Sequence, residues 1–267
     1  MRVCVLIVGI SSLTWALPGR AGLITTVTDT TTVGATVDGS ISPNEYGSGN
    51  SYSFSGGGSG FGGPVGSGTL YLNSDLNNLY IGATLNGGIG SNIVTIYLDT
   101  KTGGFDDSTM FDNGDSSRWV ATDLTRDVND VFPFQADYAL QFGNGFTNFF
   151  ELTGGSLNYI APTSAGTGGN SGAGDREASV SLATIGITPG QKVDFFTTYI
   201  SDTRFTSNEG IPAQPFSGGG NPGFGSAQVN WDNFDRFVTV PEPSTGVLML
   251  LGGCAAVWVG ARRRRDR

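Results

Sequence analysis

The sequence lacks histidine and has almost no cysteine, and both absences restrict the chemistry that the chain can perform. Its 267 residues include no histidine, and its only two cysteines, Cys4 and Cys254, lie near the two ends. Without histidine the chain cannot form a Ser-His-Asp triad, a Cys-His dyad or the usual zinc and iron ligand sets. Between the two cysteines there is no disulfide framework and no thiol nucleophile. Binding or catalysis must therefore depend on carboxylates, hydroxyls, aromatic rings and the backbone.

Basic residues are scarce in the central part of the chain. If both ends are removed, residues 22–240 form a mature chain of 219 residues with 7 basic and 21 acidic side chains, a net charge of −14. So acidic a surface repels phosphate groups, which excludes nucleic acid as a partner. It suits a soluble protein or one that binds cations. The length is sufficient for one substantial domain.

The N-terminal residues are typical of a secretory signal peptide. Arg2 supplies a positive charge, the run from Val3 to Leu17 is mostly apolar, and small residues surround a possible cleavage site after Ala21. Cleavage after Ala16 is one alternative, and a buried N-terminal strand or helix is another. We expect the export machinery to remove residues 1–21 and residues 22–240 to form an extracytoplasmic domain.

The C-terminal residues combine a proline-rich segment, a short apolar run and an arginine cluster. The apolar run, residues 246–261, has 16 residues and as a helix would span about 24 Å. Because a bilayer core is about 30 Å thick, a transmembrane helix here requires local thinning or help from its flanks. The arginines should keep the tail 262–267 in the cytoplasm. A buried core helix followed by a solvated charge cluster is the alternative.

In this order, the three C-terminal parts resemble the PEP-CTERM sorting signal of Gram-negative bacteria. The resemblance assigns residues 241–267 to a sorting signal and implies a transient inner-membrane intermediate that an exosortase processes near the prolines. It also implies release or transfer to the cell surface, in bacteria that typically make extracellular polysaccharide. The predicted sorting residues are Pro241, Glu242, Pro243, Arg262, Arg263, Arg264 and Arg265.

Between its ends the chain consists of short β-prone runs separated by turns rich in glycine, serine and asparagine. Such runs without a helical period favour an all-β fold, a single β-sandwich. One G-x-G-x-x-G match, Gly58–Gly63, precedes no strand-to-helix turn, so we interpret it as coincidence and expect no nucleotide. The predicted strands are Leu23–Thr28, Thr69–Asn73, Leu79–Leu85, Ile93–Asp99, Arg118–Thr122, Ala136–Phe142, Phe146–Leu152, Glu177–Leu182, Lys192–Ser201 and Ala227–Val240.

Several segments resemble, in order, parts of the family-9 carbohydrate-binding-module-like and DOMON-like β-sandwiches. The segment Val37–Tyr46 looks like their opening motif, and Leu79–Ala83 and Ile96–Thr100 are similar to two of their strands. Glu177–Leu182 and the turn Ile185–Gly190 are similar to a late strand and its turn. The resemblance implies an antiparallel, jelly-roll-like β-sandwich with a sugar, haem or calcium site.

The residues favour some of these ligands over others. Haem in such domains is held by histidine and methionine, whereas this chain has no histidine and its mature part has one methionine, Met110. Sugar sites in these modules use exposed aromatic rings, and Trp119 and Trp231 are the only tryptophans of the mature chain. An aromatic residue at strand spacing is more often a core residue than a sugar platform.

Acidic residues gather after the strand predicted at Ile93–Asp99. Calcium takes six to eight oxygen ligands from carboxylates and carbonyls on flexible turns, and glycines lie between these acids. Solvated turns, in which Asp and Asn bind nearby backbone groups, are the alternative. The candidate calcium ligands are Asp99, Asp106, Asp107, Asp112 and Asp115.

The amino-acid sequence leaves three functions open. The leading interpretation is a non-catalytic cell-surface or extracellular-matrix protein, sorted by an exosortase and associated with exopolysaccharide. The first alternative is a carbohydrate-binding module. The second is a glycoside-active enzyme, which requires two carboxyl groups about 5 to 9 Å apart across a cleft. The glutamates available for such a pair are Glu45, Glu151, Glu177 and Glu209.

Overall fold

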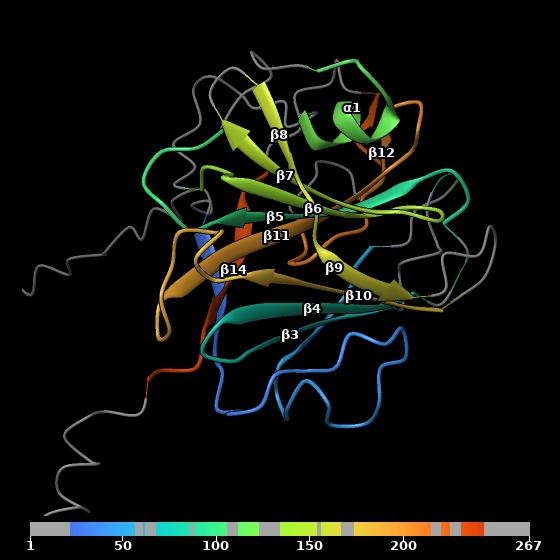
Figure 1. The fold of residues 1–267 in the computed structure, drawn as a ribbon. Coiled ribbons are helices and arrows are strands. Elements are labelled where there is room, and N and C mark those ends of the chain that lie inside the picture. Colours follow the sequence, from blue (N-terminus) through green and yellow to red (C-terminus); the bar gives the residue numbers. More distant parts are fainter. Residues whose placement is uncertain are drawn as a thin grey trace, which may run out of the picture.

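The described part of a computed structural model contains two packed β-sheets, as the sequence predicts, and one short helix, which it does not predict (Figure 1). Residues 1–21 and 243–267, which include the predicted signal peptide and sorting helix, lie outside the described part of the chain. The structure describes residues 22–56, 61, 68–85, 87, 89–105, 112–122, 134–153, 156–166, 174–214, 220–224 and 231–242.

The larger sheet has nine strands, seven of them in the order β1-β14-β11-β5-β6-β7-β8. Its pairings are antiparallel except that β1 runs parallel to β14. Two short strands, β12 and β13, extend it beside the end of β11. The bounds are β1 Gly22–Thr28, β5 Ile93–Asp99, β6 Tyr138–Phe142, β7 Thr147–Thr153, β8 Ser156–Ile160, β11 Lys192–Ile200, β12 Phe205–Thr206, β13 Gly223–Phe224 and β14 Asn233–Val238.

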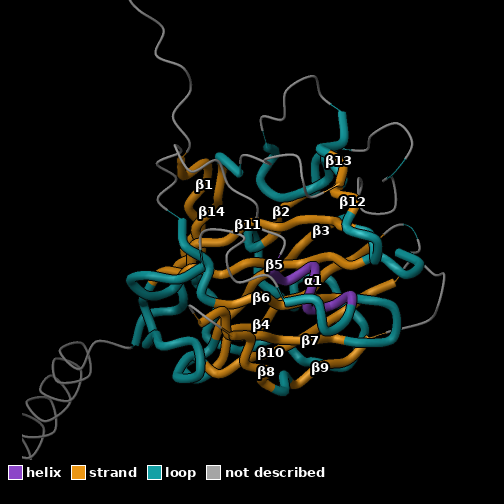
Figure 2. Tube along the Cα trace, turned by 90° about the horizontal axis from the view of Figure 1, so that it is seen from above, coloured by secondary structure: helices purple, strands orange, loops and turns teal. Residues whose placement is uncertain are grey.

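The smaller sheet has five antiparallel strands in the order β2-β3-β4-β10-β9. It lies against one face of the larger sheet, and the segment between β1 and β2 runs beneath its outer face (Figure 1). Figure 2 shows the stacked strands from above. The bounds are β2 Ser51–Ser53, β3 Thr69–Ser74, β4 Asn78–Leu85, β9 Thr163–Gly166 and β10 Gly174–Ser181.

The main hydrophobic core lies between the two sheets. Alternate residues of β5, namely Val94, Ile96 and Leu98, point into it and are fully buried. Leu70 and Leu72 of β3 reach the same core from the smaller sheet. Burying one such side chain stabilises the fold by about 1.5–3 kcal/mol, which explains why two amphipathic sheets pack face to face.

A second core covers the outer face of the larger sheet. Tyr97 of β5 and Phe196 of β11 point outward and stack with their ring centroids 5.0 Å apart. The helix α1, Ser116–Thr122, lies over this face (Figure 1), and the Tyr97 hydroxyl donates a hydrogen bond to Val120 O at 2.7 Å. Strands buried on both faces need continuous apolar runs, as in β5. The strand predicted at Arg118–Thr122 is wrong, because these residues belong to α1.

The chain leaves the sandwich directly after β14. Thr239 is fully buried, and both its N–H and its hydroxyl donate to Gln191 O at 3.0 Å. Val240 is 6% exposed and its N–H donates to Ser74 Oγ at 2.8 Å, whereas Pro241 and Glu242 are exposed. The described residues contain no helix with the length and hydrophobicity needed to cross a membrane.

Candidate functional site

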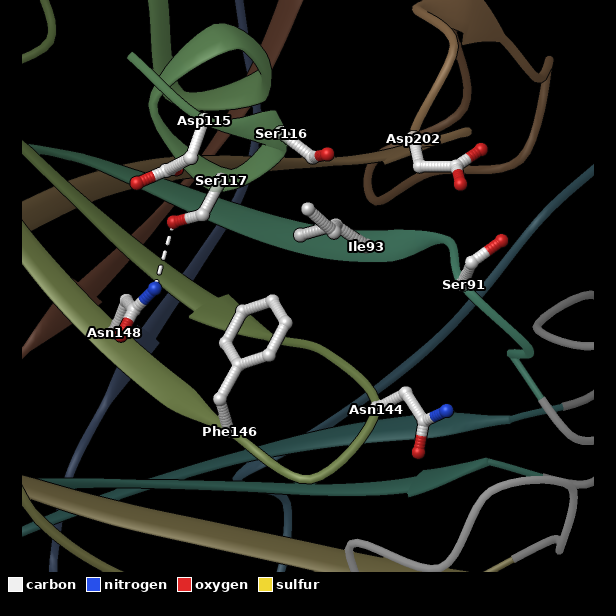
Figure 3. Close-up of a pocket in the computed structure, with 9 residues that line it drawn as sticks. All are labelled: Ser91, Ile93, Asp115, Ser116, Ser117, Asn144, Phe146, Asn148 and Asp202. Atoms are coloured by element: carbon white, nitrogen blue, oxygen red, sulfur yellow. Dashed lines mark hydrogen bonds between the residues drawn. The ribbon is translucent and has the colours of Figure 1, made fainter.

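A pocket of about 450 Å³ opens beside the first turn of α1. Its walls come from four parts of the chain: the start of α1, the start of β5, the β6–β7 hairpin, and the turn after β11 (Figure 3). Most of the lining side chains are hydroxyls, amides and carboxylates, with two apolar residues among them. The lining residues are Ser91, Ile93, Asp115, Ser116, Ser117, Asn144, Phe146, Asn148 and Asp202.

One wall of the pocket is fixed by a buried hydrogen-bond network. Asn148 Nδ2 donates to Ser117 Oγ at 2.6 Å (Figure 3), and Ser117 Oγ donates to Gln141 Oε1 at 2.8 Å. Gln141, fully buried in β6, donates in turn to Ser117 O at 3.0 Å. Satisfied buried networks of this kind hold side chains in one geometry. The first turn of α1 is therefore held rigidly against β6 and β7.

The apolar part of the pocket consists of Ile93 and Phe146. Phe146 packs against the small cluster formed by Ile93, Val120 and Ile200. Its ring also covers Gly143, where an added Cβ would collide with the ring. Figure 3 shows the ring standing on the β6–β7 hairpin beside the cavity. A flat apolar surface at a polar opening can accept the apolar face of a ligand ring.

Two polar groups of the pocket have no partner among the described residues. The Asp202 carboxylate makes no hydrogen bond or ion pair there, and Asn144 Oδ1 is buried without a donor. Buried polar atoms are nearly always paired, so each unpaired one calls for a physical explanation. The pocket thus holds unpaired hydrogen-bond acceptors next to the apolar side chains of Ile93 and Phe146, which form its apolar floor.

The two predicted sugar platforms lie elsewhere. Trp231 belongs to the outer core, is 3% exposed and stacks on Phe196 with centroids 5.3 Å apart. Its ring therefore has no free face for a sugar in this structure. Trp119 is half-buried on α1, where its Nε1 is buried without a hydrogen-bond partner in the described part of the chain. The pocket is lined by neither tryptophan.

Among the candidate calcium ligands that the structure describes, Asp99 lies apart from Asp115. Asp115 Oδ1 caps α1 by accepting from Arg118 N at 2.9 Å, and Asp112 Oδ2 pairs with Arg118 Nη1 at 2.9 Å. Asp115 lies in the pocket near the start of β5, whereas Asp99 ends that strand, about 20 Å away at the rise of an extended chain. Asp99 and Asp115 therefore do not lie close enough to share one ion.

Calcium binding itself stays a prediction. Asp106 and Asp107, two of the five candidate ligands, lie outside the described residues. Within the described ranges no group of three or more Asp or Glu side chains is arranged to hold a metal ion. The contacts of Asp112 and Asp115 agree with the alternative interpretation, in which these acids bind nearby backbone groups and Arg118.

Two carboxyl groups, the half-buried Asp99 and the buried Asp235, have an unusually high pKa. Burial raises the pKa of Asp99 to about 6, and the neighbouring carboxylates of Asp137 and Asp194 act in the same direction. Burial also raises the pKa of Asp235 to about 6, although its carboxylate accepts a hydrogen bond from Thr25 N at 2.9 Å. Desolvation disfavours the charged form, so both groups resist ionisation in the folded state.

We expect the protein to become more stable as the pH falls from about 7.5 to about 5. A carboxyl whose folded pKa lies above its unfolded value gains stability as it is protonated through pH about 6. Acids with a lowered pKa, such as Asp112 beside Arg118, lose their contribution only at lower pH. Melting temperatures across this range should rise, and the double variant Asp99→Asn with Asp235→Asn should flatten the rise. A melting temperature that falls over the same interval would contradict the assignment.

The glutamates considered for catalysis have structural partners. Glu177 is fully buried in β10 and accepts from Asp38 N, Gly39 N and the Tyr46 hydroxyl at 3.1, 2.7 and 2.9 Å. Glu45 accepts from Thr36 N, just before the opening segment, and from Ser42 N within it, both at 2.8 Å. Glu177 therefore holds the segment 37–46 on the smaller sheet, whereas Glu45 fixes the local turn around itself.

The remaining two glutamates lie apart from that segment. Glu151 of β7 forms an ion pair with Lys101, with Oε1 and Nζ 3.0 Å apart. Glu209 is 1% exposed and accepts from the Ser207 hydroxyl at 3.1 Å. None of the four glutamates lines the pocket.

The comparisons with known proteins identify the C-terminal segment. A family model for the PEP-CTERM protein-sorting motif matches residues 239–265, which confirms the resemblance predicted from the sequence. The motif marks an exported protein that passes through the membrane to the cell surface. The structure describes Pro241 and Glu242 of the predicted sorting residues, and the others lie outside its described ranges. No curated protein matches the chain.

Among solved structures, the chain is similar to a carbohydrate binding module family 9 from Caldicellulosiruptor kristjanssonii. In its complex with glucose, that module is 12% identical, with a TM-score of 0.39, and the match covers 82% of this chain and 97% of the module. In its complex with cellotriose the identity is 14%, the TM-score 0.40, and the coverage 82% and 95%. These values describe a distant resemblance, and the sandwich assignment depends on the strand pairings themselves.

Proposed function

We propose that this chain is a non-catalytic surface protein, processed by an exosortase, whose ectodomain binds extracellular polysaccharide through the pocket beside α1. The sorting motif at residues 239–265 supports the exosortase as a partner. The ligand part of the proposal depends on one observation, the unused polar groups of Asn144 and Asp202 beside the apolar floor of Phe146. Transient anchoring in the inner membrane is part of this proposal.

A sugar matches this combination of groups better than a purely apolar or purely polar ligand. One face of a pyranose ring exposes C–H groups, which can cover the Phe146 ring, while its rim carries hydroxyls that both donate and accept. Hydroxyls can then satisfy Asn144 Oδ1 and the Asp202 carboxylate, which lack partners within the described ranges. The cavity volume of about 450 Å³ lies within the range of small-molecule sites.

Replacing Phe146 with alanine should weaken polysaccharide binding by about tenfold, because the apolar floor contributes roughly 1.5 kcal/mol. Binding of the full-length protein to soluble polysaccharide fractions can be followed by affinity electrophoresis or calorimetry. The matched control is Tyr159→Ala, which removes an aromatic ring of β8 that is 50% exposed and lies outside the pocket lining. Equal binding by both variants and the unaltered protein would refute the pocket as the site.

Because Phe146 also packs on Ile93, its removal can lower stability. Each variant should therefore be checked by its melting curve. A second variant, Gly143→Ala, keeps the ring but displaces it, since the added Cβ would collide with it. Loss of binding in both variants, with folded protein in each, supports the floor as the binding surface.

A further inference from the structure

The unpaired groups of the pocket are mainly hydrogen-bond acceptors. An ionised carboxylate such as Asp202 can only accept, and the buried Asn144 Oδ1 can only accept as well. The second carboxylate is that of Asp115. One of its oxygens caps α1, but its side chain is 60% exposed and so stays accessible to a ligand. The hydroxyls of Ser91 and Ser116 can either donate or accept a hydrogen bond. A ligand that fits must therefore supply more donors than acceptors.

The pocket is also negatively charged. Its lining includes two carboxylates and no lysine or arginine. The nearest cation on α1, Arg118, already pairs with Asp112 at 2.9 Å and approaches Asp115 Oδ2 at 3.7 Å. Arg204, in the same turn as Asp202, has interactions of its own and does not line the pocket. Ligands carrying carboxylate or sulfate would be repelled here, whereas a cation would be attracted.

From these two features we propose that the pocket prefers a sugar that bears a protonated amine, and this inference rests on the proposed polysaccharide-binding function. An ammonium group supplies three donors and a positive charge, which matches the Asp202 carboxylate, while a hydroxyl of the same ligand can donate to Asn144 Oδ1. The ring that carries the amine would cover Phe146. The ligand class is an amino-sugar polymer with free amines, and neutral glucans or uronate polymers bind less well.

The shape of the pocket favours an amino sugar over a bare metal ion. A calcium ion is bound by six or more oxygens at about 2.3–2.6 Å and gains nothing from contact with an apolar surface. Here Ile93 and Phe146 form part of the lining, and the cavity volume of about 450 Å³ is far larger than one ion requires. A ring with one charged substituent uses both the apolar floor and the acceptors.

The test compares three matched tetrasaccharides, of β-1,4-linked glucose, glucosamine and glucuronic acid. Calorimetry of the full-length protein, in buffer containing a chelator and at a pH where the amine is protonated, should give glucosamine the highest affinity. We expect it to exceed glucose by about tenfold and glucuronic acid by more, since one charge-assisted hydrogen bond is involved. Asp202→Asn should remove most of this preference, so that the ratio of the glucosamine affinity to the glucose affinity falls toward one.

A matched control separates a local effect from a change in net charge. Asp38→Asn removes one carboxylate from an exposed residue outside the pocket lining and should keep the preference for glucosamine. If glucose binds as tightly as glucosamine, or if Asp202→Asn leaves the ratio unchanged, the amine preference is overturned and the proposed function stands. If no tetrasaccharide binds, or binding is indifferent to Phe146→Ala, the proposed function fails as well.

Discussion

Replacing Glu177 with alanine is expected to lower the free energy of unfolding by about 4 kcal/mol. The carboxylate is fully buried and accepts three hydrogen bonds, from Asp38 N, Gly39 N and the Tyr46 hydroxyl. Without it, the Tyr46 hydroxyl and two backbone donors lose their acceptor. The opening segment 37–46 would lose three hydrogen bonds to β10 and keep the one that Ile41 N donates to Asp175. Chemical denaturation of the full-length protein measures the effect.

Two controls sharpen this prediction. Glu177→Gln keeps one acceptor oxygen and should cost about half as much. Glu45→Ala removes a carboxylate of the same segment that is partly exposed and binds two backbone N–H groups, and it should cost only about 1 kcal/mol. If Glu177→Ala unfolds at the same denaturant concentration as the unaltered protein, then the buried carboxylate does not hold this segment.

Deleting residues 246–267 is expected to abolish the membrane-held stage of export, so that the protein leaves the cell without a membrane-bound precursor. The deleted part contains the apolar run and the arginines, which the sorting motif includes as far as residue 265. Without an apolar span and its basic flank, nothing at the C-terminus holds the chain in the bilayer. Pulse-chase labelling and fractionation of membranes, periplasm and medium follow the precursor.

The same truncation should leave the fold intact, because Val240 is the last buried residue that the structure describes before the tail. An unchanged melting temperature of the secreted product is therefore the control for misfolding. Substituting only the four arginines, Arg262 to Arg265, tests orientation separately from anchoring. A truncated strain with the same membrane-bound precursor as its parent would contradict the role assigned to the tail.

Strands with a clear hydrophobic pattern could be predicted from the sequence. The run Ile93–Asp99 coincides with β5, and Leu79–Leu85 lies within β4. Both are buried by the packing of two sheets, and burial imposes the pattern that the sequence shows. The segment Arg118–Thr122 has residues typical of strands, yet it is helical because Asp115 caps it and the outer core packs against it. Capping and tertiary contacts outweigh local propensity in such a short helix.

The pocket could not be predicted in the same way. Its residues come from four separated segments, and side chains such as Asn144 and Asp202 are ordinary turn residues when considered alone. The hairpin sequence Gly143-Asn144-Gly145-Phe146 indicated a turn, but only the fold brings it to the start of α1. Sugar sites use exposed aromatic rings, which makes Trp119 and Trp231 candidates from the sequence, but Trp231 is buried because a second core covers the larger sheet. That outer layer has no periodic signal of its own.

The direction of β11 determines how the molecule would present its pocket to the surroundings. Lys192, at the start of β11, pairs with Val238 at the end of β14, where the chain departs toward the sorting motif. Asp202 is the second residue after the far end of the same strand, and the nine extended residues of β11 separate its two ends by about 27 Å. Thr239 and Val240 are fixed in the sandwich, so only residues 241–245 link the domain to the apolar run of the sorting motif. A domain tethered so tightly would stand with its pocket on the side facing away from the point of attachment, directed toward the outside.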